Sequence, residues 1–315
     1  MAGRFPTPES TSSGAETAPA GSVPWNHTDE VLAQARVADT VIAFVGEHPC
    51  RSGEANSIST LDLPPGQLET LQAIRALGKR LVVVVFAGRA LAVDWLVDNA
   101  DAVLWAWHPG SEGGNAVADV LFGDVSPRGR LPVTCPRSVG QLPTVYNARS
   151  TGRPITGEED PRRGRYQDSL GSPLFPFRHG LTYGRVEYSP VRVEGSTASV
   201  TLRNLGDRAC TEVVQCYLRD DVAEVTRPVR ELHDFAVVEL DPGEVRQVDF
   251  RLERDRLGYH GRDNTYRTDP GTFAVWIAPD AASGQPATFT LPSPQGTMSP
   301  SAQLARPSDP RSPDE

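Results

Sequence analysis

The chain has 315 residues, a hydrophobic fraction of 38% and a formal net charge of −9. This length accommodates two domains, and the acidic balance argues against nucleic acid as a partner, because phosphate contacts need a basic surface. No apolar run approaches the roughly 18 to 20 residues of a membrane-spanning helix. Residues 1–21 also lack the apolar core of a secretory signal. We therefore expect a soluble, cytoplasmic protein without a membrane partner.

Both ends of the chain are rich in Ser, Thr, Pro and Gly, and cannot bury enough apolar surface to offset their ordering entropy. Residues 1–26 and 293–315 are therefore predicted to be disordered tails. The four cysteines have neither the spacing of a zinc site nor that of a redox motif: Cys50, Cys135, Cys210 and Cys216. We expect them to be reduced and structural, with no metal and no cofactor.

The first ordered segments are a short helix from Thr28 or Asp29 and a buried strand over residues 41–45, which is stopped by Gly46. Residues 47–63 form a long loop that carries two carboxylates, Glu47 and Glu54. In open α/β sheets, ligands and catalytic groups gather at this carboxyl edge. A helix follows from Pro64 to Gly78, with its apolar residues at helical intervals.

Strands then alternate with helices, which predicts a parallel, right-handed α/β sheet. The expected strands cover residues 81–86 and 102–107, and the expected helices cover residues 90–99 and 116–122. A last edge strand is expected at Leu131–Thr134. Residues 150–171 are polar and charged, as is typical of a linker.

Beyond Tyr188 the pattern changes to short runs of two-residue alternation separated by turn signals, which is typical of a β-sandwich. The expected strands cover residues 191–193, 198–203, 212–218, 235–240, 245–252 and 272–277.

Several segments carry a family resemblance. The central loop reads GEHPCRSGEANS and closes on LDLPPGQ, followed by FAGRAL, WHPGSEGGNAVADVLFGDVSPRGRLPVT, PRSVGQLP and YNARSTGRP. This ordered series resembles the C-terminal α/β domain of glycoside hydrolase family 3, the β-glucosidase and β-xylosidase family. The later segments PLFPF, HGLTY, TRPVREL, LDPGE and DPGTFAV resemble its connecting segment and its fibronectin type III-like domain. Four departures are visible: the family has Arg where Ile58 lies, Pro where Ala90 lies, and Gly where Arg178 and Cys210 lie.

The resemblance implies that Glu54 is the general acid/base of a retaining glycosidase, which works with a second carboxylate as nucleophile. The alternative is that Glu54 is an ordinary solvated loop residue. Glu47 is interpreted as structural, fixing the loop by accepting backbone N–H bonds. The family's nucleophile is an Asp of an N-terminal barrel, in a motif that this sequence does not contain; Asp94 precedes Trp95 on an expected helix face.

The end of the third strand offers candidate sugar contacts. Trp107 and His108 could edge a sugar subsite, with packing of a buried Trp105 and of Trp107 as the alternative. The glycine-rich segment 110–115 could hold an anion at a helix N-terminus, but tight packing is the preferred interpretation. The loop serines lack a nucleophile elbow, which disfavours a serine hydrolase.

The predicted domains are an α/β domain at residues 27–147, a linker at 148–187 and a fibronectin type III-like domain at 188–292. The predicted function is hydrolysis of β-glucoside-like O-glycosyl bonds, with Glu54 as acid/base and a separate barrel domain or chain as partner. Two alternatives stay open: a non-catalytic accessory or carbohydrate-binding module, and an inactive truncated relic.

Overall fold

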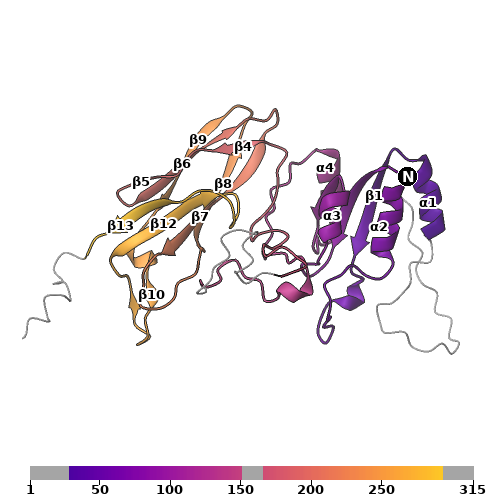
Figure 1. Cartoon of the computed structure of the whole chain (residues 1–315). Helices are drawn as coiled ribbons and strands as arrows, with labels where there is room; N and C mark the ends of the chain where they lie inside the picture. Colours follow the sequence, from indigo (N-terminus) through magenta and orange to yellow (C-terminus); the bar gives the residue numbers. More distant parts are fainter. Residues whose placement is uncertain (1–27, 151–165, 294–315) are drawn as a thin grey trace, which may run out of the picture. The chain divides into compact units, whose positions relative to one another are not determined.

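The computed structural model describes residues 28–150 and 166–293, so the two predicted tails and residues 151–165 lie outside it, apart from residue 293 (Figure 1). The described chain divides into two compact units. One contains the described residues up to Phe122 together with Cys135–Pro143, and the other contains Gly123–Thr134 and the described residues from Thr144 onward. The chain therefore passes between the two units three times.

The first unit is a three-stranded parallel sheet with helices, which confirms the predicted α/β class (Figure 1). Its strand order is β1-β2-β3, and both strand pairs are parallel. The elements are α1 (Thr28–Val37), β1 (Thr40–Gly46), η1 (Pro49–Arg51), α2 (Gln67–Ala76), β2 (Arg80–Phe86), α3 (Asp94–Asn99), β3 (Ala102–Trp105), α4 (Gly113–Phe122) and η2 (Val139–Gln141).

The core of this unit is built around the central strand. Leu81, Val83 and Val85 share one face of β2, Val84 lies on the other, and all four are fully buried. The buried apolar residues of α2 are Leu71 and Ile74, and α2 contacts both β1 and β2. This packing fixes the sheet register that places the loops at its carboxyl edge.

Some expected elements differ from the structure; the strand expected at residues 102–107, for example, ends at Trp105. The helix predicted from Ala90 begins only at Asp94, because residues 90–93 are irregular and the Ala92 amide donates to the Leu61 carbonyl at 2.7 Å. The helix predicted from residue 116 begins earlier, at Gly113. The strand predicted at residues 131–134 is absent; the Leu131 amide instead donates to the His179 carbonyl at 2.9 Å.

The second unit contains two four-stranded antiparallel sheets, which confirms the predicted sandwich (Figure 1). One has the order β13-β12-β7-β8, and the other has the order β4-β6-β5 with β9 on β6. A two-stranded β10-β11 hairpin and the 3-10 helix η3 (Arg254–Arg256) complete it. The strands are β4 (Val186–Tyr188), β5 (Arg192–Glu194), β6 (Thr197–Asn204), β7 (Cys210–Asp220), β8 (Glu231–Leu240), β9 (Val245–Arg251), β10 (Tyr259–His260), β11 (Tyr266–Arg267), β12 (Gly271–Ala278) and β13 (Ala287–Leu291).

An aromatic cluster outside the main sandwich core holds the segments that flank residues 151–165. Tyr146 stacks on Phe177 with ring centroids 4.1 Å apart, and Tyr146 meets Tyr217 of β7 edge to face at 6.2 Å. Tyr217 and Trp276 are buried in this cluster. The described part of the predicted linker is therefore packed against the sandwich.

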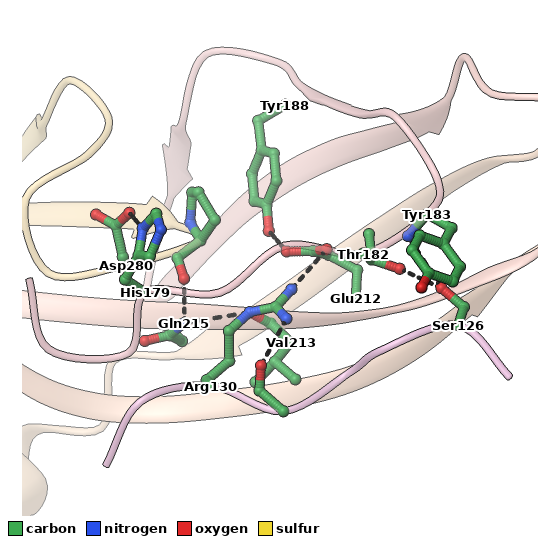
Figure 2. A network of polar contacts seen from close by, with 12 residues as sticks. Ser126, Arg130, His179, Thr182, Tyr183, Tyr188, Glu212, Val213, Gln215 and Asp280 are labelled. Atoms are coloured by element: carbon green, nitrogen blue, oxygen red, sulfur yellow. Dashed lines mark hydrogen bonds and ion pairs between the residues drawn. The ribbon is translucent and has the colours of Figure 1, made fainter. Parts of the chain in front are cut away.

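A buried ion pair joins the segment Gly123–Thr134 to the sandwich (Figure 2). The Arg130 guanidinium donates to Glu212 Oε2 at 2.9 Å, and the two side chains are only 2% and 4% exposed. The Tyr188 hydroxyl donates to the other carboxylate oxygen at 2.8 Å. Nearby, the hydroxyls of Ser126 and Thr182 are hydrogen-bonded at 2.8 Å.

Arg178, which stands where the resemblance has glycine, has a φ of 67°. This left-handed region favours glycine, so an arginine at this position strains the backbone. The Arg178 amide donates to the Leu131 carbonyl at 2.9 Å, and its guanidinium lies 5.0 Å from the ring centroid of Phe177. These contacts hold the loop in the glycine-type conformation.

The cysteines with described side chains are reduced, as predicted. Cys135, Cys210 and Cys216 are free and buried. Burial raises the pKa of Cys135 to about 11 and that of Cys216 to about 12, which keeps both thiols protonated and unreactive near neutral pH. The side chain of Cys50 lies outside the described part.

Asp280 makes the stability of the second unit depend on pH. Burial alone would raise the pKa of Asp280, but hydrogen bonds from His179, from Ser283 and from backbone amides lower it to about 2. The ionised form thus stabilises the fold above the unfolded pKa, and this contribution is lost as pH falls from about 4 to about 2. We expect Asp280→Asn to reduce the unfolding free energy by about 2 kcal/mol at pH 7.

Urea unfolding of Asp280→Asn and the unsubstituted chain at pH 7 and at pH 2.5 checks this expectation. The difference between the two chains should shrink at the lower pH. An equal difference at both values would contradict the role assigned to the carboxylate charge.

Candidate functional site

The site begins at the carboxyl end of β1, where the chain leaves the sheet at Gly46. Gly46 has a φ of 126°, and a Cβ there would lie 1.8 Å from the Phe86 carbonyl oxygen of β2. The next amide, that of Glu47, donates to this same oxygen at 2.8 Å. Only glycine allows so close an approach of the two strands, so Gly46 sets the direction in which the loop departs.

A side chain from α2 fastens the same point. The Gln67 amide group donates to the Gly46 carbonyl at 3.0 Å, and the Gly46 amide donates to Gln67 Oε1 at 2.8 Å. Gln67 is the final residue of the LDLPPGQ motif and the first residue of α2. The two ends of the loop are thereby joined.

Glu47 anchors the root of the loop from within. Its side chain is fully buried and pairs with two guanidinium groups: Arg89 Nε lies 2.9 Å from Oε2, and Arg51 Nε lies 3.5 Å from Oε1. Arg89 also donates to the Arg51 carbonyl at 2.6 Å. The predicted structural role of Glu47 is confirmed, although its partners are guanidinium groups rather than backbone N–H groups.

Arg89 is the residue of this site that reasoning from the sequence missed. It follows β2 by three positions, and β2 Phe86 pairs with Gly46 in register. An arginine just after one parallel strand and a glutamate just after its neighbour meet at one sheet edge, so opposite charges at matching positions were the available signal.

Glu54 lies in the middle part of the loop, on an exposed turn. It makes no hydrogen bond or ion pair with the described residues. The Asn56 amide donates to the Gly53 carbonyl at 3.2 Å, and the Asn56 side chain donates to the Ser52 carbonyl at 3.1 Å. Ala55 has a φ of 62°, a strained value for a residue with a Cβ. Strain of this kind is concentrated at functional sites.

The loops that follow the three parallel strands converge at Gly88. A Cβ on Gly88 would lie 2.7 Å from His108 Nε2, in the loop after β3, and 3.3 Å from Ser52 Oγ, in the loop after β1. Any larger residue at position 88 would displace the imidazole. The structure thus brings His108 to the loop that carries Glu54, while the His108 side chain stays exposed.

The two tryptophans at the end of β3 contact each other, with ring centroids 5.6 Å apart and ring planes at 45°. Both are half-buried, so Trp105 is less buried than expected. Trp105 Nε1 is itself buried and has no hydrogen-bond partner among the described residues. Trp107 has a φ of 51°, which makes it a second strained residue at this sheet edge.

Within the glycine-rich segment 110–115, the predicted tight packing holds for Gly113 alone, because a Cβ on Gly110 or Gly114 would meet nothing within 4 Å. Gly113 is buried, and a Cβ there would lie 2.5 Å from Pro109 Cγ. Within the described residues, no cluster of His, Cys, Asp or Glu side chains suits a metal ion, and no helix is long and apolar enough to cross a membrane.

Comparisons with known proteins are consistent over most of the chain. Residues 7–183 match the sequence model described as the glycosyl hydrolase family 3 C-terminal domain, and residues 212–281 match a fibronectin type III-like domain. A periplasmic β-glucosidase of Salmonella typhimurium is 40% identical over 272 residues, which cover 84% of this chain and 36% of that protein. A β-xylosidase of Formosa agariphila is 34% identical and is covered to the same 36%.

A solved structure of a β-glucosidase is also similar to this chain over most of its length. The β-glucosidase from Listeria innocua in complex with glucose superposes with a TM-score of 0.79 at 31% identity, covering 85% of this chain and 38% of that one. The chain thus spans little more than a third of the length of the relatives that it matches.

Proposed function

Because the chain belongs to glycoside hydrolase family 3, we propose that it supplies the general acid/base for hydrolysis of β-glucoside-like bonds. The residue proposed for this role is Glu54. The observation that carries the proposal is an exposed carboxylate on a turn of a loop whose root is anchored by the buried Glu47. Such a loop presents a carboxyl group to a bound sugar while its base stays in place.

The proposed reaction is the two-step retaining mechanism. In the first step the Glu54 carboxyl group gives its proton to the glycosidic oxygen as the bond from that oxygen to the anomeric carbon breaks. A carboxylate from outside this chain forms a covalent bond to the anomeric carbon. In the second step the Glu54 carboxylate takes a proton from water, which displaces the enzyme carboxylate and releases the sugar.

Trp107 and His108 are proposed to contact the sugar. The proposal is supported by the exposed position of the His108 side chain and by its closeness to the loop that carries Glu54, at Gly88. An indole face suits stacking on the apolar face of a pyranose, and an imidazole can hydrogen-bond a hydroxyl.

The test uses the section of a relative that the alignment with this chain does not cover. The 315-residue chain is mixed with the part of the Salmonella typhimurium β-glucosidase that lies outside the aligned segment, expressed as a separate chain. Hydrolysis of aryl β-glucosides is then measured. We expect activity only in the mixture, and we expect Glu54→Gln to lower kcat about 10²- to 10⁴-fold for a phenol leaving group.

Two comparisons test whether the loss of activity in Glu54→Gln is the loss of a proton donor. A dinitrophenol leaving group needs no protonation, so Glu54→Gln should slow release of dinitrophenol in the first turnover far less than release of phenol. The matched control is Asp62→Asn, an exposed carboxylate of the same loop, which should leave kcat within about twofold, as expected for a surface substitution. Equal loss with both leaving groups, or full activity of Glu54→Gln, would overturn the role of Glu54.

A further inference from the structure

A pocket of about 390 Å³ lies in the second unit, where the β10-β11 hairpin meets strands β7, β8 and β12 (Figure 1). This volume is within the range of about 300–1,000 Å³ that is typical of small-molecule sites. All the residues that line the pocket belong to the second unit, and none of the residues proposed for hydrolysis is among them. The pocket is therefore a candidate site that the proposed function does not use.

The charges of the pocket wall are balanced. Three arginines line the pocket, and each forms an ion pair with a neighbouring carboxylate: Arg219–Asp221 at 2.8 Å, Arg227–Glu231 at 3.2 Å and Arg256–Asp234 at 3.5 Å. Asp220, a fourth carboxylate, is buried in the wall without an arginine partner of its own among the described residues. A phosphate or a carboxylate in the pocket would compete with these groups for the same cations. The wall therefore disfavours an anionic ligand.

The wall nevertheless offers both donors and acceptors of hydrogen bonds. The Arg227 guanidinium has five N–H groups, of which one donates to Glu231 Oε2 at 3.2 Å, and its buried Nε has no acceptor among the described residues. His233 Nε2 and His260 Nδ1 each lie 3.2 Å from a backbone carbonyl oxygen, which can only accept. In a neutral imidazole the second ring nitrogen is then an acceptor. Burial lowers the pKa of His233, which favours its neutral form.

Tyr266 adds an aromatic ring that is already held in place. The side chain lines the pocket and is 49% exposed. Its hydroxyl donates to the Asp255 carbonyl at 2.7 Å, and its ring meets the His260 ring edge to face with centroids 5.4 Å apart. A Cβ on Gly258 would lie 2.6 Å from Tyr266 Cζ, so the ring packs directly against the hairpin backbone. A fixed, partly exposed aromatic ring suits stacking on a sugar at little cost in conformational entropy.

We propose that this pocket, here called the hairpin pocket, binds a neutral oligosaccharide, with Tyr266 stacked on one sugar ring. Arg227 donates to sugar hydroxyls, and His233 and His260 accept from them. A hydroxyl both donates and accepts, so a polyhydroxyl ligand without charge matches the wall better than an anion does. The inference goes beyond the proposed function, because a sugar held here needs neither Glu54 nor a nucleophile.

Calorimetric titration of the 315-residue chain tests the binding. The neutral probes are cellotetraose and xylotetraose, and the anionic probes are inorganic phosphate and trigalacturonic acid. We expect a neutral probe to bind more tightly than either anion. Tyr266→Ala should weaken this binding at least about tenfold, because the stacking surface is lost, whereas Tyr266→Phe keeps the ring and should stay within about threefold. The matched control is Phe235→Ala, which removes a 55% exposed aromatic ring outside the pocket and should bind normally.

Hydrogen exchange locates the sugar without any substitution. Amides of residues 256–267 should exchange more slowly when the neutral probe is bound. Trp107→Ala should retain this protection, because Trp107 does not line the hairpin pocket. The proposal is overturned if neither neutral probe binds, if an anion binds more tightly, or if Tyr266→Ala binds as the unsubstituted chain does. Protection confined to the loops of the first unit and abolished by Trp107→Ala would also overturn it.

Discussion

Gly46→Ala should unfold the α/β unit, with a loss of more than about 4 kcal/mol of unfolding free energy, in the range reserved for gross steric conflict. The added Cβ would lie 1.8 Å from the Phe86 carbonyl oxygen, and both are backbone-fixed positions. To relieve the clash, β1 and β2 must separate at the point where the Glu47 amide pairs with that oxygen. Relief therefore also displaces the root of the loop that carries Glu54.

The control for this prediction is Gly78→Ala. Gly78 also has a positive φ, 70°, but a Cβ there meets nothing within 4 Å. That substitution carries only the conformational penalty, about 1 kcal/mol. Denaturant unfolding followed by tryptophan fluorescence compares the two variants. Similar midpoints for both would mean that the contact between Gly46 and Phe86 is not what restricts the position.

Glu212→Gln should cost about 3–5 kcal/mol, the range for removing one partner of a buried ion pair. The substitution keeps the shape of the side chain and an acceptor for the Tyr188 hydroxyl, but it leaves the Arg130 guanidinium charged and almost fully buried. The Arg130 Nε atom already has no acceptor, so little remains to compensate the charge. The effect should concern the second unit, which contains all three residues.

Asp234→Asn is the matched control for the loss of an acid. Asp234 pairs with Arg256 at 3.5 Å, but both side chains are well exposed, 38% and 45%. Exposed pairs contribute about 0–1 kcal/mol. The double variant Arg130→Met with Glu212→Leu should recover most of the loss, because an apolar pair leaves no buried charge. A double variant as unstable as Glu212→Gln would show that packing, and not charge, dominates at this position.

The order and type of the main elements could be predicted from the sequence, because buried parallel strands and alternating sandwich strands have distinct periods. The exceptions have local causes. Residues 90–93 carry helix-forming side chains, yet the Ala92 amide donates to the Leu61 carbonyl and the helix begins only at Asp94. The strands β10 and β11 have two residues each, too short for any period to be seen. The strand β13 has the alternation TFT, which is visible in the sequence but short.

The candidate site, too, could be predicted only in part. The resemblance proposes Glu54 as the acid/base, and the structural role of Glu47 follows from its place after β1. The partners of Glu47 could not be named, because Arg89 comes 42 positions later and meets it only through the pairing of β1 with β2. The approach of His108 to Ser52 likewise depends on the absence of a side chain at Gly88, which no local pattern expresses.

Because the chain passes three times between its two units, it limits how sections of homologous proteins can be joined into a chimera. The segment Gly123–Thr134 is contributed to the second unit before the chain returns to the first for Cys135–Pro143. In a chimera joined after α4, Arg130 and Glu212 would come from the same parent, but Cys135–Pro143 would come from a different parent than the rest of its unit. In a chimera joined after Pro143, Arg130 and Glu212 would come from different parents. Exchange of either unit between homologous proteins therefore requires compatible sequences on both sides of every passage, and the two units are expected to be inherited together.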